Sequence, residues 1–86
     1  MDRKAWILEK DIERRRREKT RAEGGLELKF VSPGTRGVPD RIVLYPGGVI
    51  LFREYKRPGQ TLDPLQKHWK AKLERLGFKV EVVDEV

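Results

Sequence analysis

The sequence predicts a small mixed α/β domain whose elements follow one another in the order α-β-β-β-α-β. Three observations predict it: a charged, helix-like segment ended by Gly24-Gly25, two strand-like runs around Pro46-Gly47-Gly48, and a helix between two strands at the C-terminal end. A strand, a helix of this length and another strand favour a right-handed crossover, so the last strand should lie parallel to the third. We therefore expect one mixed sheet flanked by helices.

The first helix is expected over residues 3–22. Its apolar residues stand in the first half, where Ile12 marks the last of them and Trp6 could serve a dimer contact. The second half, residues 14–21, is rich in arginine. A charge run of this kind is usually a solvated face, and a surface that contacts phosphates is the alternative.

Strands follow from the alternation of apolar and polar residues. Residues 26–31 alternate with period two and predict the first strand, and residues 32–39 form a loop with two prolines and two glycines. Residues 41–45 and 49–56 flank Pro46-Gly47-Gly48, which is the strongest hairpin signal in the chain.

The second helix has clear signals at both ends. Asp63 is a good N-cap, Pro64 suits the first helical position, and Gly77 ends the helix. One side carries an apolar stripe, so we expect Trp69 in the core and His68 exposed on the polar side; the stripe comprises Leu65, Trp69, Leu73 and Leu76. Residues 78–83 alternate again and predict the last strand.

Composition limits the possible functions. The 86 residues predict one domain, residues 1–86, and with 40% charged residues its core must be small. The absence of cysteine excludes disulfides and thiolate zinc sites. No apolar run is long enough for a membrane span or a secretory signal, so we expect a soluble intracellular protein. The net charge of +6 points to a polyanionic partner such as nucleic acid.

The register of the hairpin brings two carboxylates together. With a three-residue turn at 46–48, Tyr45 pairs with Val49 and Asp40 faces Glu54. One face of the hairpin then carries an apolar core patch with a charged cluster at its end; the set is Asp40, Ile42, Leu44, Ile50, Phe52, Glu54 and Lys56. A shift of one residue would separate these groups onto opposite faces.

Asp40 and Glu54 suit a divalent cation. Directly opposed residues have β-carbons roughly 4.5–5.5 Å apart, where like charges repel unless something compensates them. A cation such as Mg²⁺ or Mn²⁺ takes hard oxygen ligands and can be shared by such a pair. Lys56 lies about 7 Å further along the same face, from where its ammonium can reach a phosphate or an attacking water. Taken singly, each residue fits a turn cap or a surface ion pair; taken together, they indicate a nuclease.

These residues resemble a known family. Pro39-Asp40 followed by Glu54-Tyr55-Lys56 resembles the PD-(D/E)XK nuclease signature. The longer strings at 32–40 and 54–59, with Gln66 and Leu76-Gly77-Phe78, closely resemble the VRR-NUC family over roughly residues 9–83. The resemblance implies a restriction-endonuclease-like fold and a metal-dependent DNA endonuclease.

The resemblance also implies roles for individual residues. Asp40, Glu54 and the carbonyl of Tyr55 would bind the metal, and Lys56 would be the catalytic lysine. Glu13 is our choice for the acidic residue of the first helix, with Glu9 as the competitor. Gln66 would assist a metal-bound water or the binding of DNA, although an exposed helix position without such a role is an equal alternative. The residues expected to contact DNA are Thr35, Arg36, Arg57 and Lys67.

The resemblance further implies a viral, phage-like homodimer, which is typical of stand-alone family members of this size, and action on branched DNA such as four-way junctions. A homodimer provides the two sites that paired incisions in a four-way junction need. For a viral protein we expect the cytoplasm of the host cell as the location. Two rival functions remain open: a non-catalytic DNA-binding module with the same fold, and a subunit whose metal serves stability alone. The sequence leaves open whether one or two metals are used.

Two features depart from the family pattern. Arg53 stands where relatives carry an apolar residue, on the face of Val43, Leu51 and Tyr55, where a charge is costly unless it is paired. The first helix also lacks apolar residues at three positions, occupied here by Arg16, Thr20 and Glu23.

Overall fold

The computed structural model describes residues 8–84. Its elements have the order that the sequence predicts, α-β-β-β-α-β. They are α1 (Glu9–Ala22), β1 (Leu26–Lys29), β2 (Arg41–Tyr45), β3 (Val49–Tyr55), α2 (Pro64–Arg75) and β4 (Lys79–Val83).

The four strands form one mixed sheet in the order β1-β2-β3-β4. β1, β2 and β3 are antiparallel neighbours, and β4 lies parallel to β3 as expected of the crossover. Tyr45 pairs with Val49 and Ile42 with Phe52, so the predicted hairpin register is confirmed. Gly47 and Gly48 form the turn with φ of 87° and 75°, which is the left-handed region that favours glycine.

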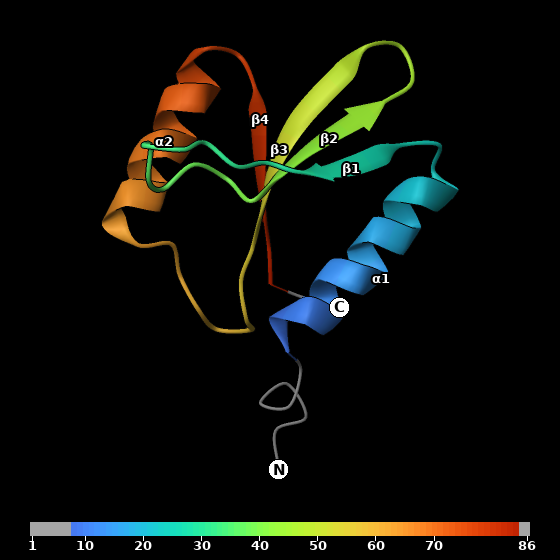
Figure 1. The fold of residues 1–86 in the computed structure, drawn as a ribbon, viewed down its shortest axis with the longest axis horizontal. Helices are drawn as coiled ribbons and strands as arrows, with labels where there is room; N and C mark the ends of the chain where they lie inside the picture. The colour runs from blue at the N-terminus through green and yellow to red at the C-terminus, as the bar shows by residue number, and fades with distance from the viewer. Residues whose placement is uncertain (1–7, 85–86) are drawn as a thin grey trace.

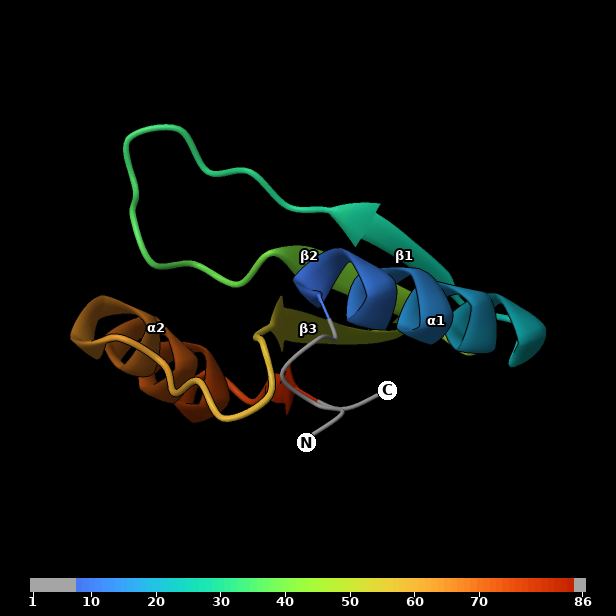
Figure 2. The ribbon, with the colours of Figure 1, turned by 90° about the horizontal axis from the view of Figure 1, so that it is seen from below.

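The two helices cover different faces of the sheet. Successive side chains of a strand point to opposite faces. On β3, Arg53 contacts Thr20 of α1, whereas its neighbour Glu54 contacts Gln66 of α2. Figure 1 shows α1 beside β1 at one edge and α2 beside β4 at the other, and Figure 2 shows the loop after β1 extending toward the side of α2.

The best-packed core lies on the face that α1 covers, and not on the face expected to form the core patch. Ile12, Val43 and Tyr55 are at most 1% exposed. On the other face only Phe52 among the expected apolar residues is buried, and Ile50 is 46% exposed. The expected core patch is thus only partly buried, at Phe52 beside Val80 of β4, because α2 packs chiefly against β4 and leaves the β1–β2 part of this face uncovered.

The apolar stripe of α2 is also less buried than expected. No residue of α2 is buried, and Leu76 is 70% exposed. Trp69 is half-buried and packs edge-on against the exposed ring of His68, with their centroids 5.7 Å apart. The expectation for His68 is therefore confirmed, whereas Trp69 is not a core residue because α2 lies along one edge of the sheet.

Strand boundaries differ from the expected ones by at most two residues. β1 ends at Lys29, but the amide of Phe30 still donates to the carbonyl of Asp40 at 2.8 Å. β3 ends at Tyr55, and the amide of Lys56 continues the pairing with Val83 at 3.0 Å. α1 begins at Glu9, and the expected helical residues 3–7, including Trp6, lie outside the described residues. Over residues 8–84, every helix is too short or too polar to cross a membrane.

Candidate functional site

Asp40 and Glu54 meet where the hairpin register places them. Asp40 directly follows the buried Pro39 and precedes β2. Its backbone amide donates to Glu54 Oε2 at 3.2 Å, and its own Oδ2 accepts from the amide of Tyr55 at 3.1 Å. These two bonds fix both carboxylates at the end of the β2–β3 hairpin.

Gln66 faces Glu54 and is not a solvent-exposed helix residue. Its Nε2 donates to Glu54 Oε1 at 2.9 Å, and its side chain is half-buried. The other end of its amide is fixed as well, because Oε1 accepts from the amide of Asp63, the N-cap of α2, at 3.0 Å. A capping box therefore holds the amide of Gln66 against the site.

Glu54 is a buried acid with an unusual proton affinity. It is only 4% exposed, and burial together with the charge of Asp40 raises its pKa to about 8. The ammonium of Lys56 lowers that pKa and is therefore close enough to interact with the carboxylate. The buried carboxylate of Glu54, next to the half-buried Asp40, therefore has a strong need for positive charge when it is ionised.

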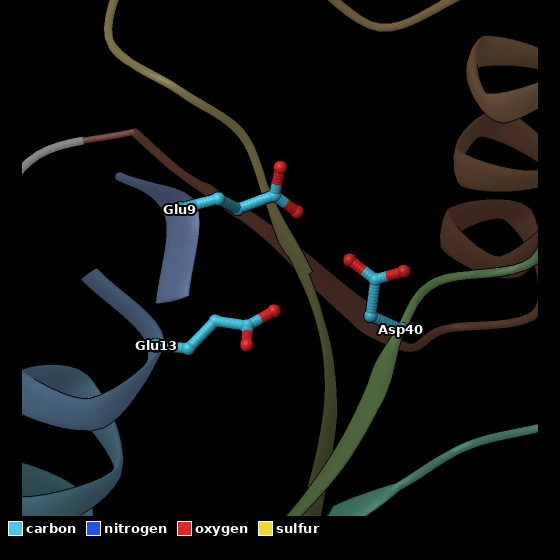
Figure 3. Close-up of side chains that lie close together, drawn as sticks. All are labelled: Glu9, Glu13 and Asp40. Carbon is cyan, nitrogen blue, oxygen red and sulfur yellow. The ribbon is translucent and has the colours of Figure 1, made fainter. Parts of the chain in front are cut away.

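Two glutamates of α1 complete an acidic cluster around Asp40. Glu9 and Glu13 stand one helical turn apart, so they share a face of α1. Each of the three residues offers a carboxylate oxygen, and these oxygens lie within 4.8 Å of one another (Figure 3). The structure thus brings both Glu13 and its competitor Glu9 to Asp40. Glu54 lies beside this group and is not one of its three members.

The donor set of the cluster fits a hard divalent cation. Mg²⁺ and Mn²⁺ prefer carboxylate oxygens, and three of them converge here without any nitrogen or sulfur donor. Burial, followed by the charges of Asp40 and Glu13, raises the pKa of Glu9. A bound cation would relieve this repulsion, so the residues present suit such an ion.

The residues expected to contact DNA lie at different distances from the cluster. Arg57 lowers the pKa of Glu9 and therefore lies within electrostatic reach of it. Arg36 is exposed and lines an open pocket of about 610 Å³ together with Asp40 and Gln66. Thr35 is half-buried in the same loop, and Lys67 is exposed on α2; neither lines that pocket.

The charge of Arg53 is buried and paired. Its side chain is completely buried, and its guanidinium donates to Glu27 Oε1 at 2.6 Å, to Glu81 Oε2 at 3.0 Å and to Thr20 Oγ1 at 2.9 Å. The hydroxyl of Tyr55 donates to the same oxygen of Glu27 at 2.6 Å. Burial opposes the charge of Arg53, but its hydrogen bonds to these acids raise its pKa above the usual value.

The departures in α1 and at its C-cap, Glu23, take part in the polar contacts of the same face. Thr20 accepts from Arg53, Arg16 lies 3.6 Å from Glu81, and Glu23 accepts from the hydroxyl of Tyr45 at 3.1 Å. Sequence reasoning noted that Arg53 needs a partner but did not name Glu27 or Glu81. The available signal was their position: Glu81 pairs with Arg53 on the neighbouring strand β4, and Glu27 stands on β1, one strand beyond β2, on the same face of the sheet.

Glu54 makes the stability of the metal-free protein dependent on pH. Its pKa rises from 4.5 to about 8 on folding, so between these values the folded state binds more protons than the unfolded state. Stability should therefore fall as pH rises through this window, by up to about 1.4 kcal/mol per pH unit. Urea denaturation in EDTA at several pH values measures it, and Glu54→Gln should flatten the profile. A wild-type profile that is already flat would contradict the assignment.

Comparisons with known proteins place the chain among nucleases. No family model matches the sequence. The chain is 47% identical over 78 residues to the "Putative nuclease p44" of Acyrthosiphon pisum secondary endosymbiont phage 1, covering 91% of this chain and 84% of that protein. Among solved structures it is similar to a "VRR_NUC domain", with a TM-score of 0.86 and 33% identity over 90% of this chain and 84% of that one.

Proposed function

Because the chain belongs to the VRR-NUC family of nucleases, we propose that it is a DNA endonuclease that hydrolyses phosphodiester bonds with a bound Mg²⁺ or Mn²⁺. The observation that carries the metal requirement is the convergence of Glu9, Glu13 and Asp40 beside the buried Glu54. The net charge of +6 supports a polyanionic substrate. We take residues 1–86 as one domain that acts on DNA inside the host cell.

Asp40 and Glu54 are the proposed metal ligands, with Glu13, Glu9 and the carbonyl of Tyr55 as further oxygen donors. A divalent cation held there would lower the pKa of a bound water and offset charge that develops on the phosphate. Gln66 fixes the orientation of Glu54 through the hydrogen bond of 2.9 Å. Lys56, which interacts with both Glu54 and Glu9, would orient the attacking water or stabilise the charge on the reacting phosphate.

Basic residues around the cluster would hold the DNA backbone. Arg57 lies near Glu9, and Arg36 lines the pocket beside Asp40, where a guanidinium can pair with a phosphate. Thr35 in the same loop and Lys67 on α2 would extend this contact surface.

We further propose that the enzyme acts as a homodimer on branched DNA such as four-way junctions. One chain carries one acidic cluster within residues 8–84, whereas symmetric incisions need two active sites. The uncovered face of the sheet supports association, because it exposes apolar side chains that a second copy would bury. They include Leu26, Leu28 and Ile50, which are 45–53% exposed.

A substrate panel tests this proposal. Labelled single-stranded, duplex, flap and four-way DNA are incubated with the protein in Mg²⁺, in Mn²⁺ or in EDTA. We expect cleavage with either metal, strongest on the four-way junction, and none in EDTA. A protein that shifts the junction without products would be a binding module, and one that gains melting temperature from metal but ignores DNA would use the metal for stability alone. Either result would overturn the proposed function.

A further inference from the structure

We propose that Arg41 is a built-in counter-ion of the acidic cluster, which pairs with Glu13 in the metal-free protein and competes there with the divalent cation. The inference rests on the proposed metal site and assigns to Arg41 a part in setting its affinity. Neither the sequence motif nor the comparisons point to Arg41; it follows from the contacts of its guanidinium.

Arg41 lies directly between the acidic cluster and the buried polar core. It follows Asp40 in the chain and begins β2. One guanidinium nitrogen, Nη2, is 3.5 Å from Glu13 Oε2, and the Nε is 3.9 Å from Glu27 Oε2. Its side chain is only 16% exposed, so solvent screens these contacts less than those of a surface ion pair. Among residues 8–84, Arg41 is the basic residue that is ion-paired with Glu13.

Glu27 lies on the side of the Arg41 guanidinium that is away from the acidic cluster. The side chain of Glu27 is fully buried, and its Oε1 already accepts from Arg53 and Tyr55. Its Oε2 and the Nε of Arg41 are buried atoms without a hydrogen-bond partner in the described part of the chain, and they face each other at 3.9 Å. Because a buried carboxylate oxygen retains a strong demand for positive charge, Arg41 is kept between Glu27 and Glu13.

The position of Arg41 has opposite consequences with and without metal. Without a cation, Glu9, Glu13 and Asp40 repel one another, and the guanidinium compensates part of that repulsion. With a cation bound, two positive charges share Glu13 and repel each other. Removing the charge of Arg41 should therefore strengthen cation binding and weaken the metal-free fold.

Calorimetric titration with MnCl₂ tests this sign. Arg41→Gln should bind Mn²⁺ roughly three- to tenfold more tightly than wild type, whereas Arg41→Lys, which keeps the charge, should stay within about twofold. In a Glu13→Gln background the effect of Arg41→Gln should shrink, because the two positive charges no longer compete for one carboxylate and only their direct repulsion remains. Should Arg41→Gln fail to fold in the absence of metal, Arg41→Met keeps the length of the side chain and carries the same expectation.

Thermal unfolding gives a second readout without DNA. In EDTA, Arg41→Gln should melt below wild type, and saturating Mn²⁺ should raise its melting temperature by more than that of wild type. If Arg41→Gln binds Mn²⁺ equally or more weakly while wild type binds it, the counter-ion role is wrong and the metal site stands. If wild type itself binds no Mn²⁺, the metal site is wrong, and the counter-ion role falls with it.

Discussion

Replacing Asp40 by asparagine is expected to reduce DNA cleavage about a thousandfold or more while the protein stays folded. Asp40 is the residue that both parts of the site share. Its carboxylate lies in the cluster with Glu9 and Glu13, and its backbone amide donates to the carboxylate of Glu54. Asparagine keeps the size of the side chain and an oxygen that can accept from the amide of Tyr55. It removes the negative charge that a divalent cation requires. Rates of junction cleavage in Mg²⁺ measure the effect.

Glu18→Gln is the matched control for the Asp40 variant. Glu18 is an exposed acid of α1 and is not a member of the acidic cluster. The Glu18→Gln variant loses one negative charge, as Asp40→Asn does, and should cleave DNA at the wild-type rate. A mobility-shift assay should show that the Asp40 variant still binds the junction. Cleavage by Asp40→Asn at the rate of the control would refute the role of Asp40.

Replacing Arg53 by methionine is expected to destabilise the protein by about 3–5 kcal/mol, because the change breaks a buried ion pair by removing one partner. Glu27 would keep a fully buried carboxylate and lose its guanidinium at 2.6 Å, and Glu81 would lose its contact at 3.0 Å. Methionine fills much of the space of the arginine, so lost packing contributes little. The free energy of unfolding from urea denaturation measures the change.

Two further variants separate charge from packing at this position. Arg15→Met removes an exposed arginine of α1 and should change stability by less than about 0.5 kcal/mol. The double variant Arg53→Met with Glu27→Gln should recover part of the loss, because it no longer leaves a buried charge unpaired. Stability of Arg53→Met equal to that of Arg15→Met would show that the buried network does not stabilise the fold.

The topology and the meeting of Asp40 with Glu54 could be predicted because both depend on local signals. The turn at Pro46-Gly47-Gly48 fixes the hairpin register, and the register carries Asp40 to Glu54. Likewise, Asp63-Pro64 marks the start of α2, and that start places Gln66 at the site.

The part that α1 and β1 contribute to the site could not be predicted in the same way. Arg41 connects Glu13 with Glu27, and these three residues come from β2, α1 and β1. No local pattern specifies how α1 packs across the sheet, so the choice between Glu9 and Glu13 stayed open until the structure brought both to Asp40.

The prediction of which sheet face holds the best-packed core failed for a related reason. Alternation along β3 separates Phe52 from Arg53 but does not say which face a helix covers. The apolar content of the Ile50 face favoured it as the core, whereas α1 packs on the other face and buries Arg53 there with its acidic partners. Periodicity does not detect these long-range charge pairs.

Anomalous diffraction at the manganese edge, from crystals grown with MnCl₂, tests the central claim most directly. We expect a peak between Asp40 and Glu54, within bonding distance of carboxylate oxygens and next to the α1 glutamates. A peak elsewhere on the protein, or no peak between these side chains, would contradict the account of a cation-dependent nuclease.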